Sequence, residues 1–142
     1  MYTENGMADK NGVSGKAVQL EEIGQIALTV RDLARAKDFY HNTLGMKFLF
    51  DAGTMAFFQC GAVRLMIGAS QEAVAGSGTI LYFKINDIDE VFRSLQAQGV
   101  DFVDAPHLVA KMPDHDLWMV FLRDPDGNTL GLMSEVASTP PR

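Results

Sequence analysis

Few side chains of this 142-residue chain could do chemistry, and most of them fall on alternating positions of predicted strands. The three His and one Cys leave a narrow base for imidazole or thiol chemistry. Arg64 carries a guanidinium that can bind a carboxylate or phosphate through two hydrogen bonds. Gln25 offers an amide that can both donate and accept a hydrogen bond near the centre of a site. These residues predict recognition of a small molecule, with Arg64 as the anchor for an anionic group.

Apolar side chains share the strand parity of these two polar groups. Mainly apolar walls with a few polar groups are the usual composition of a small-molecule site, and aromatic and Met side chains adapt to flat ligands. The alternative is that Met66, Ile80 and Met133 fill a collapsed cup, while Arg64 and Lys84 form exposed ion pairs with Glu135 or other acids. The predicted binding residues are Gln25, Thr29, Arg64, Met66, Ile80, Tyr82, Trp118, Met133 and Glu135, with the strand face of Trp118 left open.

A second set of side chains could hold a metal ion. His107, His115 and Glu135 all lie in the second half of the chain, and imidazole with carboxylate is a common ligand set for divalent metals. However, Asp114-His115-Asp116 after Pro113 is typical of an exposed turn, and His107 is typical of a loop. The three residues therefore remain only a weak candidate for a displaced metal site.

These side chains must be positioned by two copies of one pattern, offset by 55 residues. The first copy runs from Gln25 to Ala36 and the second from Ile80 to Val91; each is an alternating strand, an Asp and the start of an amphipathic helix. Alternation puts successive side chains on opposite faces of a strand. Asp32 and Asp87 are suited to cap the helices that follow them. The duplication predicts a cup built from two half-sheets.

Shorter strands complete each copy, separated by turns. The turn Asp124-Pro-Asp-Gly-Asn128 is the clearest, because Pro presets φ and Gly takes the left-handed position. The strands are predicted at Lys47–Asp51, Met55–Gln59 and Val63–Gly68 in the first copy, and at Asp101–Val103, Trp118–Arg123 and Thr129–Ser134 in the second.

The domain organisation follows from the same pattern. We expect one domain over residues 21–137, because a chain of this length most often folds as a single unit. The expected parts are a flexible leader over 1–20, module one over about 23–68, a linker over 69–78, module two over about 79–136 and a flexible tail over 138–142.

Composition argues against several classes of partner. Twelve basic and 18 acidic residues give a net charge of −6, the opposite of what a nucleic-acid surface needs. No apolar run reaches the roughly 18 residues of a membrane helix, and the first residues lack the apolar core of a signal peptide. A single cysteine allows no intrachain disulfide, which is typical of a reducing compartment. We expect a cytoplasmic protein without nucleic-acid or membrane partners.

The order of these elements resembles the vicinal oxygen chelate superfamily, which includes glyoxalase I, bleomycin-resistance proteins, extradiol dioxygenases and methylmalonyl-CoA epimerase. The resemblance implies an α+β fold of two βαβββ modules that form a cupped mixed sheet. It also implies helices on the convex side, a small-molecule ligand on the concave side, and a homodimer. The residues that carry it are Gln25–Asp32 with Phe39-Tyr40, Leu44-Gly45-Met46, Ile80–Asp87 and Asp124–Leu132.

The resemblance also implies where a metal would bind, and this chain departs from that pattern. Metal-dependent members place one ligand on each of four strands, here at Gln25, at Arg64 or Met66, at Ile80 and at Gly131. Ile80 and Gly131 offer no donor and Arg64 repels a cation, whereas divalent metals need oxygen or nitrogen donors. We therefore expect no cofactor at the family positions. An extradiol dioxygenase fits least, because it needs two His and one carboxylate.

Three functions remain open. The first is a metal-free protein of bleomycin-resistance type that binds an aromatic or amphipathic, anionic compound in the cup, and the missing ligands favour it. The second is a glyoxalase- or epimerase-type lyase or isomerase at the displaced site, with Gln25 and Glu135 as remnants of its metal and proton chemistry. The third is a non-catalytic regulatory or interaction dimer, whose cup would be filled by its own side chains.

Overall fold

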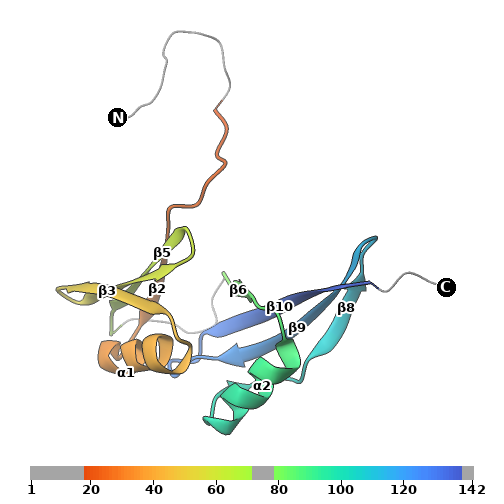
Figure 1. Cartoon of the computed structure of the whole chain (residues 1–142). Helices are drawn as coiled ribbons and strands as arrows, with labels where there is room; N and C mark the ends of the chain where they lie inside the picture. Colours follow the sequence, from red (N-terminus) through yellow and green to blue (C-terminus); the bar gives the residue numbers. More distant parts are fainter. Residues whose placement is uncertain (1–17, 72–78, 139–142) are drawn as a thin grey trace.

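The structure is a computed structural model that describes residues 18–71 and 79–138. Within them the chain forms two sheets, each with its own helix (Figure 1). The expected leader 1–20, linker 69–78 and tail 138–142 lie largely outside the described residues. No helix in the two described stretches is long and apolar enough to cross a membrane.

The first module is a four-stranded sheet in the order β2-β5-β4-β3. Strand β2 (Gln25–Val30) runs parallel to β5 (Val63–Ala69), while β4 (Met55–Cys60) is antiparallel to both β5 and β3 (Lys47–Ala52). Helix α1 (Leu33–Lys37) follows β2 and continues as a π-helical segment, η1 (Asp38–Thr43).

The second module repeats this plan. Strand β6 is parallel to β10, as β2 is to β5, and the sheet order is β6-β10-β9-β7 with β8 also paired to β9. The α+β fold of two βαβββ-like modules is therefore confirmed. The elements are β6 (Leu81–Lys84), α2 (Ile88–Ala97), β7 (Asp101–Phe102), β8 (His107–Lys111), β9 (His115–Arg123) and β10 (Thr129–Ala137).

One part of the second module differs from the expectation. His107 lies in a strand rather than a loop, and His115 and Asp116 already belong to β9 rather than to a turn. The reason is a hairpin between β8 and β9, closed by a hydrogen bond from Met112 N to His115 O at 2.7 Å and interrupted by a bulge near Leu108. Long-range pairing gives strand structure to residues whose own pattern is that of a turn.

Both predicted helix starts are confirmed. The Asp32 carboxylate accepts a hydrogen bond from Arg35 N at 3.0 Å, and Asp87 accepts one from Glu90 N at 3.1 Å. Each carboxylate satisfies a backbone N–H that the first helical turn leaves without a partner. The two halves of the duplication thus begin their helices in the same way.

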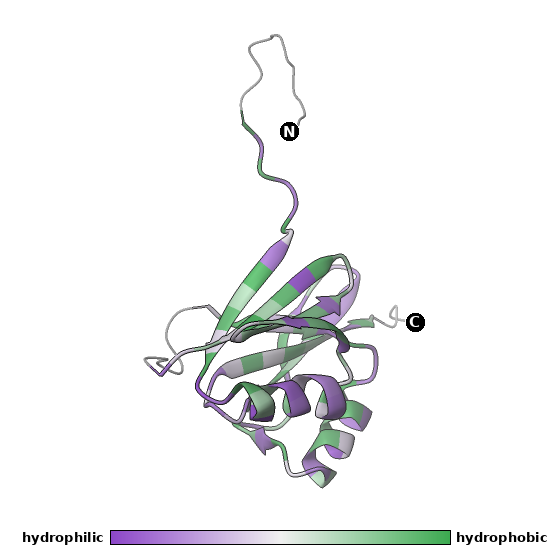
Figure 2. Ribbon diagram, turned by 90° about the vertical axis from the view of Figure 1, so that its left-hand side faces the viewer, coloured by the Kyte–Doolittle hydropathy of each residue, from purple (hydrophilic) through white to green (hydrophobic). Residues whose placement is uncertain are grey.

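The core lies between the sheets and the two helices, which are on the same side of both sheets (Figure 1). Hydrophobic and hydrophilic residues alternate along the strands (Figure 2). In β2, Ile26, Leu28 and Val30 are the more buried set, and Gln25, Ala27 and Thr29 are exposed. The face of each sheet away from the helices is therefore free to form a binding surface; we call it the cup face.

The turn between β9 and β10 joins the two modules. The buried Tyr40 hydroxyl donates to Asp124 Oδ2 at 2.9 Å, and Arg35 forms an ion pair with Asp126 at 3.2 Å. Asp126 Oδ1 also accepts from Arg31 N at 2.9 Å. The predicted turn is more than a chain reversal, because its carboxylates fix the first module against the second.

Candidate functional site on the cup face

The cup face of module one brings together three of the predicted binding residues. Gln25 pairs with Arg64 in the register of β2 and β5, and Met66 follows Arg64 by two positions on the same face. Arg64 Nε donates to Gln25 Oε1 at 2.8 Å, and Gln25 Nε2 lies 4.0 Å from Met66 Sδ. The guanidinium is thus oriented by an amide across two parallel strands.

Two aromatic residues beside this group were not predicted as site residues. The Arg64 guanidinium carbon lies 5.7 Å from the centre of the Phe57 ring, within the range of a cation–π contact. Phe50 stacks on Phe57 with ring centres 4.6 Å apart and an angle of 13° between the ring planes. Together they form a flat aromatic surface next to a positive charge.

The register explains why sequence alone missed this surface. Phe57 is the Cα partner of Met66, which places it on the cup face, whereas Phe58 faces the core. Phe50 pairs with Phe57 only because a bulge between Phe48 and Phe50 shifts β3 by one residue. Alternation within β4 could have pointed to Phe57, but no local signal marks the bulge.

The charge on Arg64 is not neutralised by a carboxylate in the described part of the chain. Its contacts there are the Gln25 amide and the Phe57 ring, and the residue is exposed. Glu135, the acid expected as a partner for Arg64 or Lys84, forms its ion pair with Lys84 at 3.2 Å. The Arg64 guanidinium therefore keeps donors available for an anionic group.

The cup face of module two is built around Gly131. Tyr82 on β6 and Phe121 on β9 are its two cross-strand partners, and their rings meet edge to face with centres 5.8 Å apart. A Cβ atom at position 131 would lie 2.6 Å from Tyr82 Cδ2 and 3.2 Å from Phe121 Cε1. The Tyr82 ring therefore occupies the space that a side chain at position 131 would need.

The remaining predicted binding residues lie apart from Arg64 and Gln25. Thr29 is exposed near the end of β2, and Ile80 precedes β6 with 37% of its surface exposed. Met133 shares the face of Gly131 and is the Cα partner of Lys84. Trp118 is different, because it lies on the same strand face as the buried Val120, on the side facing the helices, and packs against the core. Trp118 therefore does not lie on the cup face.

The three residues of the displaced metal site do not converge. His107 Nδ1 lies 2.9 Å from the carbonyl of Ala105, His115 Nδ1 lies 2.7 Å from Asp114 Oδ1, and Glu135 pairs with Lys84. The hydrogen bond from His115 lowers the pKa of Asp114. In residues 18–71 and 79–138, no group of three or more His, Cys, Asp or Glu side chains could hold a metal ion.

The residues at the family metal positions also do not fit a divalent cation. The only amide oxygen there, on Gln25, already accepts a hydrogen bond from the cationic Arg64. The Tyr82 ring covers Gly131, one of the positions at which the resemblance implies a metal ligand. A metal needs several oxygen or nitrogen donors, and this part of the cup offers a positive charge and aromatic rings.

Comparison with known proteins agrees with this architecture. The chain is 27% identical over 124 residues to the uncharacterized protein YraH of Bacillus subtilis, covering 75% of this chain and 92% of YraH. It superposes on the lactoylglutathione lyase of Agrobacterium tumefaciens with a TM-score of 0.69 and 23% identity, covering 82% and 95% of the two chains. A glyoxalase family protein from Enterococcus faecalis gives 0.68 and 25%, covering 80% and 97%.

The family follows from the sequence itself as well as from the shape. A sequence model of the glyoxalase/bleomycin resistance protein/dioxygenase superfamily matches residues 22–132, which span the first module and most of the second. The chain therefore belongs to the glyoxalase/bleomycin resistance protein/dioxygenase superfamily.

Proposed function

We propose that this protein binds a small anionic molecule with an aromatic or amphipathic body on its cup face, without a metal at the family positions. The observation that carries the proposal is the arrangement of Arg64. Its guanidinium is held by Gln25 at 2.8 Å and stands over Phe57, and no carboxylate of the described chain neutralises it. An oriented arginine beside an aromatic surface suits a flat molecule that carries a carboxylate, sulfonate or phosphate.

The surroundings of Arg64 set the shape of the ligand. Phe50 and Phe57 offer a stacked pair of rings, with Phe50 46% exposed, and Met66 adds an adaptable apolar contact. A planar group can lie on these rings while its anionic end reaches Arg64. Thr29, Tyr82, Met133 and Glu135 are proposed as peripheral contacts from the rest of the cup face.

Binding without turnover is favoured over lyase or isomerase chemistry. Proton transfer next to a carbonyl needs a basic group and an electrophile at one place. Here the candidate base, Glu135, is paired with Lys84. His107 contacts the carbonyl of Ala105, and His115 contacts Asp114. A non-catalytic dimer with a cup filled by its own side chains is disfavoured as well. Four side chains of the cup face are exposed rather than packed together, namely Gln25, Arg64, Tyr82 and Lys84.

We also propose that the protein is a homodimer. Large apolar side chains are exposed on the β8–β9 hairpin and at the end of β10, where a second copy would cover them. They are Leu108, Val109, Met112 and Val136, each between 40% and 48% exposed. Light scattering after gel filtration tests this proposal, and a molar mass of 15.5 kDa at micromolar concentration would reject it.

The binding proposal is tested with 1-anilinonaphthalene-8-sulfonate, an anionic aromatic probe whose fluorescence rises on binding. We expect Arg64→Ala to weaken its affinity by about tenfold or more, because a hydrogen bond to a charged group contributes about 1.5–3 kcal/mol. Arg93→Ala is the matched control, because Arg93 is exposed on α2, away from the cup face. Equal affinity of the Arg64 variant and the control would remove Arg64 from the site.

A further inference from the structure

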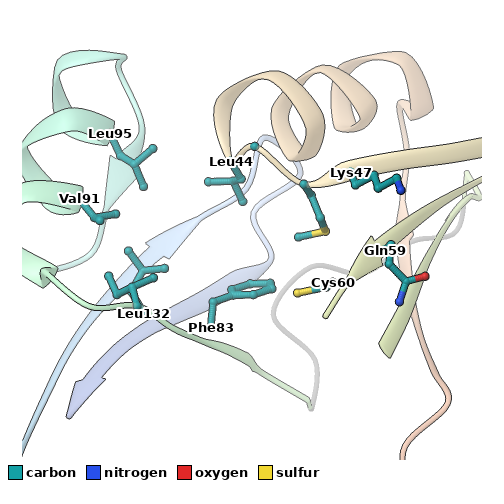
Figure 3. Close-up of a pocket in the computed structure, with 11 residues that line it drawn as sticks. Leu44, Lys47, Gln59, Cys60, Phe83, Val91, Leu95 and Leu132 are labelled. Carbon is teal, nitrogen blue, oxygen red and sulfur yellow. The ribbon is translucent and has the colours of Figure 1, made fainter. Parts of the chain in front are cut away.

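A cavity of about 400 Å³ lies between the two modules and is lined mainly by apolar residues. Figure 3 shows Leu44 of module one facing Val91, Leu95, Leu132 and Phe83 of module two, with Cys60 nearby. In that view the side chains of Lys47 and Gln59 extend away from this apolar group. The register agrees, because Gln59 is the Cα partner of both Arg64 and Lys47, which places these two on the cup face.

The internal duplication explains why the cavity exists. Leu95 of α2 stands 55 residues after Tyr40, so the two residues hold equivalent places in the two modules. The turn between β9 and β10 spans residues 124–128, and its Asp124 reaches the Tyr40 hydroxyl at 2.9 Å. The equivalent turn between β4 and β5 is only Gly61-Ala62. Leu95 lines the cavity, which is consistent with a turn too short to fill the space beside it.

The lining defines the chemistry of an occupant. The walls are mainly aliphatic and aromatic side chains, with the sulfur atoms of Met46 and Cys60. Lys47 and Gln59 also line the cavity, but Figure 3 shows their side chains extending away from the apolar group. Burying an ion there would leave its charge without a partner, which is strongly unfavourable. An uncharged apolar group would instead replace water at apolar walls, at a gain of about 25 cal/mol per Å² of buried apolar surface.

We propose that this cavity is a second binding site, distinct from the cup, for an uncharged apolar molecule of about two rings. Its volume falls within the roughly 300–1,000 Å³ of ordinary ligand sites. It also exceeds the engineered apolar cavity of about 150 Å³ that holds one benzene. None of the residues in the contacts that join the modules, between Tyr40 and Asp124 and between Arg35 and Asp126, lines the cavity.

The test uses N-phenyl-1-naphthylamine, an uncharged fluorescent probe, with the full chain. Val91→Phe adds a ring inside the cavity and should weaken probe affinity by about tenfold or more. Val103→Phe is the matched control, because it makes the same substitution at an exposed position just after β7. Arg64→Ala should also leave affinity unchanged, which separates this site from the cup.

Cys60 provides a second readout that needs no variant. It is the only cysteine of the chain, it is partly buried, and it lines the cavity. Bound probe should slow alkylation of Cys60 by N-ethylmaleimide several-fold, and this result decides alone if Val91→Phe does not fold. The proposal is overturned if the probe shows no saturable binding, if Val91→Phe binds like Val103→Phe, or if alkylation is not slowed.

Discussion

Tyr40→Phe tests the contact that joins the two modules. Tyr40 is fully buried, and its hydroxyl donates to Asp124 Oδ2 at 2.9 Å. Asp124 is 4% exposed and also accepts from Asp126 N, Asn128 N and Asn128 Nδ2 at 2.8–2.9 Å. The substitution removes one of these four donors and leaves the ring in place, so no cavity is expected beyond the lost oxygen.

The magnitude follows from the charge and burial of the acceptor. A hydrogen bond to a charged group contributes about 1.5–3 kcal/mol, and a buried acceptor that loses a donor is not compensated by water. Because three donors to Asp124 remain, we expect a loss near the lower end, about 1.5–2 kcal/mol in the free energy of unfolding. The effect should appear on the stability of the whole chain, because Tyr40 and Asp124 belong to different modules.

Urea unfolding followed by circular dichroism measures this loss as a lower midpoint at constant slope. Tyr82→Phe is the matched control, because Tyr82 is 46% exposed and its hydroxyl has no hydrogen-bond partner in the described residues. We expect that control to stay within about 0.5 kcal/mol of the parent protein. If the two variants lose equal stability, the Tyr40–Asp124 bond does not hold the modules together.

Three further predictions follow from individual contacts. Burial, together with Asp124, raises the pKa of Tyr40 above its usual 10.0. Above pH 10 the unfolded chain therefore loses a proton that the folded chain keeps. The free energy of unfolding should then fall by about 1.4 kcal/mol for each pH unit above about 10. Alkaline urea titrations should show this component in the parent protein and not in Tyr40→Phe. Asp32→Ala should cost about 1 kcal/mol as a lost cap without changing sulfonate-probe affinity, and an unchanged urea midpoint would contradict the cap. Gly131→Ala should cost about 1–2 kcal/mol of stability through overpacking against Tyr82. In a Tyr82→Ala background this cost should vanish, because Ala suits a strand better than Gly by roughly 0.5–1 kcal/mol. A double-mutant cycle that shows no coupling between positions 131 and 82 would refute the close approach of the Tyr82 ring to Gly131.

Much of the fold could be predicted because it is encoded locally and twice. The alternation in Gln25–Val30, the capping carboxylates of Asp32 and Asp87, and the turn at residues 124–128 each depend on a few neighbouring residues. The hairpin of β8 and β9 could not be predicted in this way. Its strands form because residues near His107 pair with residues near Met119, and no short-range pattern reports that pairing.

The candidate site likewise contains residues that local strand parity could place and residues that only long-range pairing places. Gln25, Arg64 and Met66 could be assigned to one face from strand parity, and the structure places them together. Phe50 could not, because a single bulge moves it onto the cup face beside Phe57. Trp118 lies on the opposite face, because it shares strand parity with Val120 and Leu122, which are buried in the core.

The sequence by itself determined the two-module fold, the helix starts and the poor fit of the family positions to a metal, because residue type and period carry that information. Only the tertiary structure decided which charges are neutralised and which are not. Glu135 is paired with Lys84, which leaves Arg64 beside Phe57 with Gln25 as its partner. The cavity beside Leu95 also became visible only in the tertiary structure. It lies where the modules differ, since the β4–β5 turn is shorter than the β9–β10 turn. Ion pairs and cavities depend on distances between segments far apart in the chain, and a one-dimensional pattern does not contain those distances.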